Sequence, residues 1–470
     1  MSDRGRRCCG LLGLMISLLA ASGCHQTDPV RTGQWLPLTP DVPDPGLIGV
    51  WEDPVRGHLV AFSEGETLVF HRNNHSCIAD SGVVPGFSLY RLGRGGDRLE
   101  LAHYDYRAYP HLLAAPSVLH RSELPPLVAA GGAEPGDVFG MIWRALDRWY
   151  AGFERRGVDW AAARAAFEPR ARSVETNEDL FGVLSEMTAM LGDGHVNVRL
   201  GELSANAGRP RLRARLAEAW KASGSELAEG EFVARWHRDA VDSVYAVLDE
   251  GSLRSGLAGA LEWGVIGAPG GDVGYLRINR FGRFTDEPVS RPEQIDLVMV
   301  AMHSALADLG DTRSLIVDVS MNGGGNDAAA LTFASFFTDA RRTAFTYEYN
   351  RGPAQTVELV PAGVTYDRPV FVLTSEVTAS AAEAFVLAMR SIPHVTHTGE
   401  RTRGDISSLL PKPFPNGFLV TIAYQRVLDA EGRWFEGVGI PPEFAAPVFP
   451  ADRLYGGPGR AIRWIADGVN

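Results

Sequence analysis

The sequence predicts an α+β protein of several domains, with an α/β core in its C-terminal half. Strand-like apolar runs alternate with helical segments after Gly270, an order typical of parallel α/β structure. Residues 136–192 carry apolar side chains at helical spacing, and residues 46–127 form short alternating runs typical of antiparallel strands. A chain of 470 residues with 45% hydrophobic content is long enough for two or three such domains.

The first 24 residues have the pattern of a secretion signal. Three arginines precede an apolar run over residues 11–20, which is too short to span a bilayer comfortably. The run leads into Ala-Ser-Gly-Cys, which resembles the lipobox of bacterial lipoproteins. This resemblance implies that Cys24 is acylated and anchors the protein to a membrane. His25 stands where inner-membrane retention needs an aspartate, so we expect the outer membrane of a bacterial cell envelope, facing the periplasm.

The patterns divide the rest of the chain into segments. They are a polar tether (25–45), a small antiparallel β-domain (46–127), a helical subdomain (136–204), a helical insertion (205–262), an α/β core (263–450) and a C-terminal helix or tail (451–470). The insertion is rich in Ala, Arg and Glu, which indicates charged, solvated helices.

Charge and cysteine content exclude several classes of protein. The formal net charge is −12 and no basic tract occurs, which argues against a nucleic-acid partner. Cys77 is the one cysteine after residue 24, so no internal disulfide is expected. His71, His75 and Cys77 are ligand types at close spacing, but among predicted hairpins they indicate an ordinary loop rather than a metal site.

Ser380 lies in the most informative segment, PVFVLTSEVTASAAEAF (369–385), which predicts a strand, a turn and a helix in succession. A serine at such a corner is exposed at the end of a sheet, and the first N–H groups of the helix point at whatever reacts with it. This geometry suits a nucleophile. The alternative is an ordinary serine that caps the helix.

Six motifs occur in the order found in the C-terminal-processing and tricorn-core serine peptidases, and the chain resembles this family. The motifs are LGDGHVNV (191–198), DVGYLRINRFG (272–282), LIVDVSMNGGGNDAAALTFASFF (315–337), TSEVTASAAEAF (374–385), TGERTRGD (398–405) and FEGVGIPPEF (435–444). The resemblance implies a ClpP/crotonase-like core that hydrolyses peptides by acyl transfer, without a metal or organic cofactor.

The two branches of the family differ in the general base. One branch uses a lysine directly after a Gly-x-x-Thr-x-Gly turn, but here the turn ends at Gly404 and Asp405 follows. The only lysines, Lys221 and Lys412, stand elsewhere, and arginine stays protonated. The tricorn-like branch uses a histidine that titrates near working pH, and the resemblance gives this role to His195. Taken alone, His195 is more typical of a structural or surface histidine.

The same branch implies that Glu436 orients the base and stabilises the imidazolium. Without the resemblance, Glu436 is typical of a solvated turn. Gly194 stands where the branch has a serine beside the histidine, so Asp193, water or Glu436 itself would hold His195. Ser320 also replaces a usual arginine.

The resemblance further implies an oxyanion site formed by the N–H groups of Ala381 and Gly324. Glycine allows the close backbone approach and positive φ that such a site needs. No Gly-Lys-Ser/Thr follows the glycines, and no dinucleotide fingerprint occurs, so this is not a phosphate loop.

The sequence therefore predicts a lipid-anchored serine peptidase of the cell envelope that cleaves peptides or unfolded protein ends. Ser380 is the expected nucleophile and His195 the expected base. A rival hypothesis is a non-catalytic lipoprotein that binds a ligand or peptide on the same fold.

Overall fold

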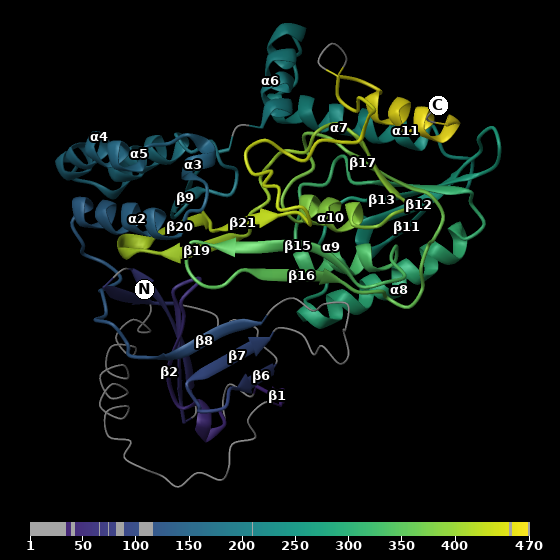
Figure 1. Ribbon diagram of the computed structural model, residues 1–470. Coiled ribbons are helices and arrows are strands. Elements are labelled where there is room, and N and C mark those ends of the chain that lie inside the picture. The colour runs from purple at the N-terminus through teal and green to yellow at the C-terminus, as the bar shows by residue number, and fades with distance from the viewer. Residues whose placement is uncertain are drawn as a thin grey trace. The chain divides into compact units, whose positions relative to one another are not determined.

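The computed structural model describes most of the chain (Figure 1). The described residues are 34–38, 43–64, 66–73, 75–80, 89–102, 116–208, 210–450 and 454–468. The chain divides into two compact units, one formed by Met1–Asp105, Pro116–Ala133 and Pro413–Asn416 and the other by Tyr106–Ala115, Glu134–Lys412 and Gly417–Asn470. The predicted signal peptide and its Cys24 lie outside the described residues. None of the helices in the described ranges combines the length and the apolar character needed to cross a bilayer.

The first unit is an eight-stranded antiparallel sheet in the order β1-β6-β7-β8-β2-β3-β4-β5. Its elements are β1 (Leu36–Pro37), η1 (Pro45–Leu47), β2 (Gly49–Asp53), β3 (His58–Ser63), β4 (Glu66–Asn73), β5 (Ser76–Ala79), β6 (Leu89–Leu92), β7 (Arg98–Ala102) and β8 (Ser117–Ser122). In β3, Val60 and Phe62 join one core cluster while Leu59 and Ala61 join another, because successive side chains of a strand point to opposite faces. The predicted N-terminal antiparallel sheet is confirmed.

Two of the three ligand-type residues in this unit are buried and have protein partners. His71 Nε2 lies 2.9 Å from a carboxylate oxygen of Asp80, and the His71 ring packs edge-on against His58. Cys77 Sγ donates to the carbonyl of Pro125 at 3.3 Å, and burial raises the pKa of its thiol to about 11. These contacts account for the burial of His71 and Cys77.

The second unit is built on a seven-stranded sheet in the order β11-β12-β13-β14-β17-β18-β22. Its strands are β11 (Arg254–Gly256), β12 (Leu261–Ile266), β13 (Val273–Ile278), β14 (Ser314–Asp318), β17 (Val370–Thr374), β18 (Val395–Gly399) and β22 (Phe444–Ala445). The strands from β13 to β22 are parallel, and β11 and β12 add an antiparallel edge. The apolar runs of the sequence form β13, β14 and β17, since strands covered on both faces need continuous apolar side chains.

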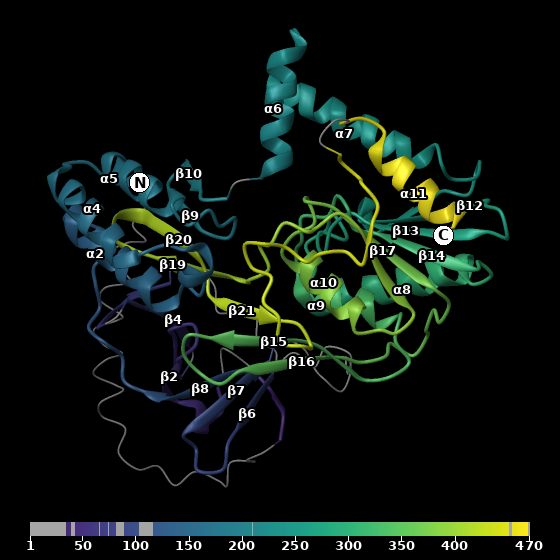
Figure 2. The same ribbon diagram turned by 45° about the horizontal axis from the view of Figure 1, so that its top comes forward.

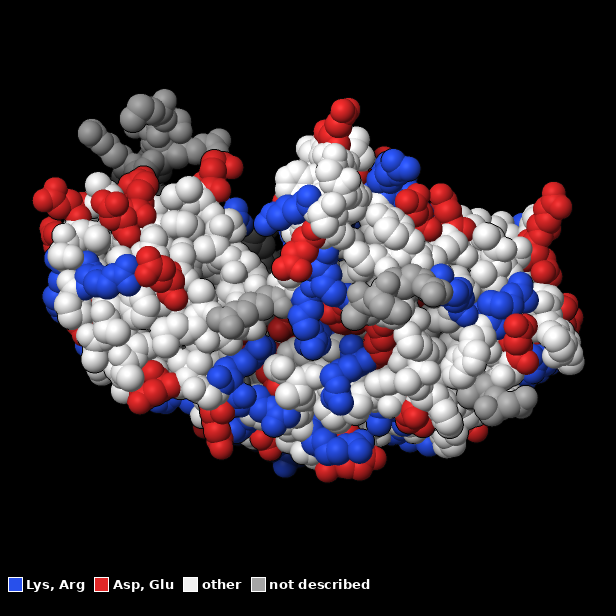
Figure 3. Space-filling model, turned by 90° about the horizontal axis from the view of Figure 1, so that it is seen from above, with Lys and Arg blue, Asp and Glu red and all other residues white. Residues whose placement is uncertain are grey.

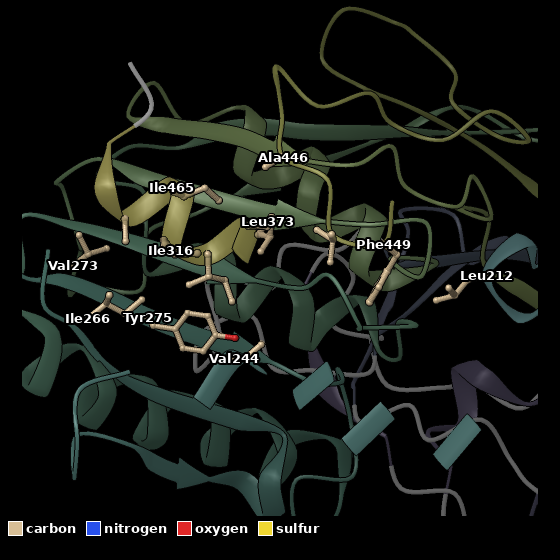
Figure 4. Close-up of a cluster of buried hydrophobic side chains, with 14 of the residues drawn as sticks. Leu212, Val244, Ile266, Val273, Tyr275, Ile316, Leu373, Ala446, Phe449 and Ile465 are labelled. Atoms are coloured by element: carbon tan, nitrogen blue, oxygen red, sulfur yellow. The ribbon is translucent and has the colours of Figure 1, made fainter. Parts of the chain in front are cut away.

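Helices cover both faces of this sheet (Figures 1 and 2). The connections between parallel strands are α8 (Arg291–Leu309), α9 (Asp327–Ser335) and α10 (Ala381–Arg390), which lie together on one face. The opposite face is covered by α7 (Glu229–Tyr245) and α11 (Gly457–Asp467). Figure 4 shows the core on that side, where Val244 and Ile465 belong to one buried cluster with Tyr275 and Ile316 of the sheet.

Residues 205–262 differ from the expected solvated helical insertion. They contain α6 (Arg211–Ser223) and α7, but also β11 and the start of β12. Trp236 and Val244 of α7 are buried on the sheet, and β12 pairs with β13 along its whole length. The charged residues of this segment lie mostly on outer faces. In the sequence they are so frequent that the apolar residues packing against the core are hard to recognise.

Strands from the far end of the chain complete the helical subdomain. Its elements are α2 (Pro135–Trp149), α3 (Phe153–Arg156), α4 (Trp160–Ser173), α5 (Asn177–Ala189), β9 (Asn197–Leu200) and β10 (Leu203–Asn206). β9 pairs with β20 (Phe418–Ala423), giving the sheet β10-β9-β20-β19 with β19 (Leu409–Pro413) at its edge. A further sheet joins β15 (Arg342–Tyr349), β16 (Gln355–Leu359) and β21 (Gln425–Leu428). Long-range pairing therefore fixes the strand that follows His195.

Candidate active site

Ser380 occupies a strained corner between β17 and α10. Its backbone has φ 58° and ψ −127°, which residues with a Cβ rarely adopt. An ordinary capping serine has an extended backbone instead, so the cap position alone does not explain this conformation. Ser380 is partly exposed, whereas Ala379 and Ala381 are buried. Such strain persists only where the surroundings enforce it, and it often marks a functional position.

The glycine turn after β14 lies directly against this corner. Gly324 has φ 109°, and a Cβ built on it would lie 2.7 Å from Ser380 Cβ and 3.1 Å from Ala381 N. The close approach and the positive φ both require glycine. Ala381 is the first residue of α10, so its N–H has no partner inside the helix. The Gly324 N–H, in contrast, donates to Asn322 Oδ1 at 2.8 Å. The two predicted oxyanion donors are therefore adjacent, but a side chain engages one of them.

His195 lies in the loop between α5 and β9. Its N–H donates to Asp193 Oδ1 at 2.8 Å, and its carbonyl accepts the Thr421 hydroxyl at 3.0 Å. The side chain is buried, and within the described part of the chain its Nδ1 has no hydrogen-bond partner. Asp193 thus holds the main chain of His195 rather than its ring, and neither Asp193 nor Glu436 contacts Nδ1.

Asp405 joins the loop of Ser380 to the loop of His195. Its carbonyl accepts the Ser380 N–H at 2.8 Å, and its Oδ1 lies 3.3 Å from Gly194 N. A Cβ on Gly194 would collide with the Asp405 carboxylate. Gly194, which replaces the serine of the tricorn-like branch, is therefore packed directly against Asp405, the residue that excludes a lysine base.

Glu436 is buried beside Arg156, a residue that the sequence did not single out. Glu436 Oε1 accepts Arg156 Nη2 at 2.9 Å, and Oε2 accepts two main-chain N–H groups at 3.0 and 3.1 Å. Arg156 Nη2 also lies 3.3 Å from Asp405 and 3.5 Å from Asp193. Burial raises the pKa of Glu436 well above its usual value, and the charge of Asp193 adds to this, while Arg156 opposes it.

These three carboxylates are the one group of potential metal ligands found among the described residues. Oxygens of Asp193, Asp405 and Glu436 lie within 4.8 Å of one another. The guanidinium of Arg156 stands within 3.5 Å of each, so a cation of the protein itself already offsets part of their charge. We therefore assign no metal to this group.

Glu383 is a second buried charge that the sequence did not single out. Its carboxylate accepts the Thr402 hydroxyl at 2.6 Å and the N–H groups of Gly404 and Asp405 at 2.8 and 2.9 Å. Burial raises its pKa to about 7, although these hydrogen bonds act in the opposite direction. The spacing Ser-x-x-Glu at the start of a helix is the signal that points to this residue.

Asp327 is an additional acid near the histidine. It begins α9 and accepts the Tyr347 hydroxyl at 3.1 Å and the Ser408 hydroxyl at 3.2 Å. Burial raises its pKa, whereas these hydrogen bonds lower it.

The two lysines lie in other parts of this unit. Lys412 is on β19, with Nζ 3.8 Å from the centroid of the Trp149 ring. Lys221 is in the last turn of α6. The residue after the Gly404 turn is Asp405, whose contacts are described above.

Two family models match the chain. Residues 272–446 match peptidase family S41, and residues 132–189 match the tricorn protease C1 domain. These two segments are therefore similar to serine peptidases of the C-terminal-processing and tricorn type, in agreement with the motif order.

Curated relatives match over part of their length. The carboxy-terminal processing protease CtpA of Bacillus subtilis is 28% identical over 151 residues, which are 30% of this chain and 32% of that protein. The carboxyl-terminal-processing protease of Synechocystis is 29% identical over 198 residues, 40% of this chain and 43% of that protein. The chain thus spans less than half of the length of these relatives.

Solved structures support the fold. A Parabacteroides merdae protein described as a peptidase is 23% identical with a TM-score of 0.55, and the match covers 71% of this chain and 96% of that one. Mature CPAF is 13% identical with a TM-score of 0.52, with the same coverage of 71% and 96%. The predicted α+β fold with a peptidase-type core is confirmed.

Proposed function

We propose that this chain is a serine peptidase that hydrolyses peptides or unfolded protein ends through an acyl-enzyme. The observation that carries the proposal is the strained Ser380, placed beside the Gly324 turn and at the N-terminus of α10. The names of the relatives, which are carboxy-terminal processing proteases, favour a substrate cut near its C-terminus.

In the proposed reaction, Ser380 Oγ attacks the scissile carbonyl carbon as His195 takes the hydroxyl proton. The C–N bond of the tetrahedral intermediate then breaks, and His195 returns the proton to the leaving amine. Water hydrolyses the resulting ester by the same route, with His195 first taking a proton from water and then returning one to Ser380. A hydroxyl is a poor nucleophile without such a base, and imidazole titrates in the range required.

The oxyanion is proposed to bind the N–H groups of Ala381 and Gly324. Because the Gly324 N–H donates to Asn322 Oδ1, the incoming carbonyl has to replace that side-chain oxygen. The Asn322 amide is itself held by a bond of 2.9 Å from Nδ2 to the carbonyl of Ile278. Loss of one such donor typically lowers the rate ~10²–10³-fold.

Glu436 is proposed to hold the loops that surround His195, the general base. It accepts hydrogen bonds from the main chain after Asp405 and from Arg156, so it holds the loops rather than the imidazole ring. Asp193 is proposed to hold the His195 backbone.

The test is Ser380-dependent chemistry in the purified full chain. A fluorophosphonate probe should label wild type and not Ser380→Ala, and only wild type should hydrolyse an unfolded protein. Ser391→Ala, at the other end of α10, is the matched control and should behave as wild type. Equal hydrolysis by correctly folded Ser380→Ala would overturn the proposal.

The Gly324 N–H is already hydrogen-bonded to Asn322, and His195 Nδ1 has no partner among the described residues. Both observations favour a second candidate, a non-catalytic binding protein on the same fold. Saturable binding of a peptide, without probe labelling or turnover, would support it.

We also propose that Cys24 carries lipid and places the protein in the cell envelope, at the outer membrane facing the periplasm. The support is the basic start, the short apolar run and the Ala-Ser-Gly-Cys sequence. Two or more acyl chains suffice for stable anchoring. Intact mass of the native protein should show acylated Cys24 at the N-terminus, and Cys24→Ser should leave an uncleaved precursor. An unmodified Cys24 in the mature protein would contradict this proposal.

Nucleic acid is not a proposed partner. On the face drawn in Figure 3, basic and acidic side chains are interspersed. Proteins that bind nucleic acids present a surface dominated by basic side chains instead.

A further inference from the structure

Arg156 lies at the end of a short helix that reaches into the proposed active site. It is the last residue of α3, and Gly157 ends the helix with φ 64°. The preceding Arg155 donates to the carbonyls of Glu436 and Trp434 at 3.1 and 2.9 Å. The end of this helix is therefore attached to the segment around Glu436 by two consecutive arginines.

A single guanidinium contacts three segments that are far apart in the sequence. Arg156 Nη1 donates to the carbonyl of Gly192 at 2.7 Å, which belongs to the histidine loop. Nη2 lies 3.5 Å from Asp193, 3.3 Å from Asp405 and 2.9 Å from Glu436. The side chain is 12% exposed, so these ion pairs are largely shielded from water.

Two of these contacts, with Asp193 and Asp405, lead to a reacting residue of the proposed machinery in one further step. Asp193 accepts the N–H of His195 at 2.8 Å. Asp405 accepts the N–H of Ser380 at 2.8 Å through its carbonyl. Arg156 thus stands one residue away from both the nucleophile and the base, and it contacts neither of them in the described structure.

The contacts among Asp193, Asp405 and Glu436 depend on the positive charge of the arginine. These three buried carboxylates around one guanidinium leave an excess of negative charge when all are ionised. Without Arg156 these carboxylates repel one another across the boundary between the two loops, and removing one partner of a buried ion pair leaves the other charges uncompensated. A planar fork with several donors suits this bridging role better than a lysine ammonium does.

We propose that Arg156 is a positioning residue of the hydrolytic reaction, holding the loop of His195 in register with the loop of Ser380 through Asp193 and Asp405. The inference rests on the proposed peptidase function. It predicts that Arg156 acts on kcat rather than on substrate binding, because its contacts are with the loops that carry the reacting groups.

The test compares Arg156→Ala and Arg156→Lys with wild type in the full chain. We expect Arg156→Ala to lower kcat about 10²-fold with little change in KM, since small displacements of reacting groups have effects of this size. Arg156→Lys should recover only part of the loss. Millimolar guanidinium should restore activity to Arg156→Ala, because it supplies the missing cation.

Arg170→Ala is the matched control. Arg170 is in the same subdomain but pairs with Glu186 at the surface, so it should retain the wild-type kcat and show no response to guanidinium. Circular dichroism gives the folded fraction by which all rates are divided. If Arg156→Ala does not fold, the kcat per folded molecule of Arg156→Lys tests the inference instead, because lysine retains the positive charge.

The outcomes separate this inference from the proposed function. Absence of Ser380-dependent hydrolysis in wild type would overturn the peptidase proposal and, with it, the role of Arg156. Ser380-dependent hydrolysis together with an unchanged kcat per folded molecule in the Arg156 variants would overturn the inference alone. Arg156 would have only a structural role if two results were found together. Activity would fall in proportion to the amount of folded protein, and guanidinium would not restore it.

Discussion

The buried carboxylate of Glu383 accepts the N–H of Ser380 at 3.2 Å, three residues earlier in the chain. Through the same carboxylate, the corner that carries the serine is tied to the turn that ends at Gly404. The Glu383 carboxyl group and the Asp405 carbonyl therefore both hold the Ser380 N–H, which helps to keep a residue with positive φ in this conformation.

Replacing Glu383 by Gln should destabilise this corner. All four groups that face the carboxylate are donors, so an amide NH₂ would oppose an N–H or a hydroxyl. We expect the free energy of unfolding to fall by about 1–3 kcal/mol, the usual effect of an unsatisfied buried group. Chemical denaturation measures it, with Glu186→Gln, at an exposed helical site, as the control. Equal effects of the two substitutions would contradict the role of Glu383.

The same residue predicts a pH dependence of stability. Burial raises the pKa of Glu383 to about 7 in the folded state, above its ordinary value of 4.5. Between these values the folded protein holds a proton that the unfolded chain has lost, so stability from this group is present below pH 4.5 and declines as pH rises toward 7. Its contribution to the slope is at most about 1.4 kcal/mol per pH unit. Urea denaturation of wild type between pH 4.5 and 7 should show a steeper decline than that of Glu383→Gln, and parallel curves would refute the assignment.

Gly324→Ala should abolish reactivity of the serine, and Gly323→Ala should not. A Cβ on Gly324 would lie 2.7 Å from both Ser380 Cβ and the carbonyl oxygen of Ala379, whereas a Cβ on Gly323 meets no atom within 4 Å. The strained φ of 109° adds about 1–3 kcal/mol of destabilisation at position 324. The rate of labelling by a fluorophosphonate and the melting temperature compare the two variants. Similar labelling of both would show that the turn does not constrain Ser380.

Ser380→Gly should be inactive and yet more stable than wild type. Its φ of 58° is accessible to glycine without the cost that a Cβ imposes, about 1–2 kcal/mol for a left-handed conformation. We expect a rise of about 1 kcal/mol in the free energy of unfolding by urea. Ser391→Gly is the control, because Ser391 has an ordinary helical φ of −75° and should lose stability on the same substitution. A destabilised Ser380→Gly would mean that the corner is not strained.

Neither lysine should be needed for hydrolysis. Lys412 stacks on Trp149 and Lys221 lies on α6, so Lys412→Met and Lys221→Met should retain the wild-type kcat/KM. The rate should rise with pH as the histidine base loses its proton. An inactive but folded lysine variant would restore a lysine as the base.

The sequence allowed prediction of those parts of the molecule whose signals are local. Apolar runs identify β14 and β17, and the corner after β17 identifies Ser380 as the candidate nucleophile. Arg156 and Glu383 could not be predicted in this way, because the local sequence does not distinguish a buried charged residue on a helix from an exposed one. Their burial depends on tertiary contacts, and the partner of Arg156 at Glu436 is 280 positions away.

The antiparallel edge of the core sheet is another part of the fold that local sequence patterns do not predict. Leu261–Ile266 becomes a strand because it pairs with β13, and Arg254–Gly256 pairs in turn with Leu261–Ile266. The Ala-, Arg- and Glu-rich composition before them gives no indication of this pairing. The contact between Gly194 and Asp405 is also invisible in the sequence, although both positions depart from the family pattern.

The sheet that joins β9 to β20 has a consequence for the order in which the protein matures during synthesis. Leu200 pairs with Phe418, so the strand that follows His195 has no neighbour on that side until most of the chain has left the ribosome. Contacts of such long sequence separation form late, after local helices and hairpins. A nascent chain therefore contains Ser380 before the histidine loop has its final support, and we expect the proposed hydrolytic activity only after β20 has been synthesised. This delay would protect the chain itself, and its unfolded neighbours, from premature cleavage.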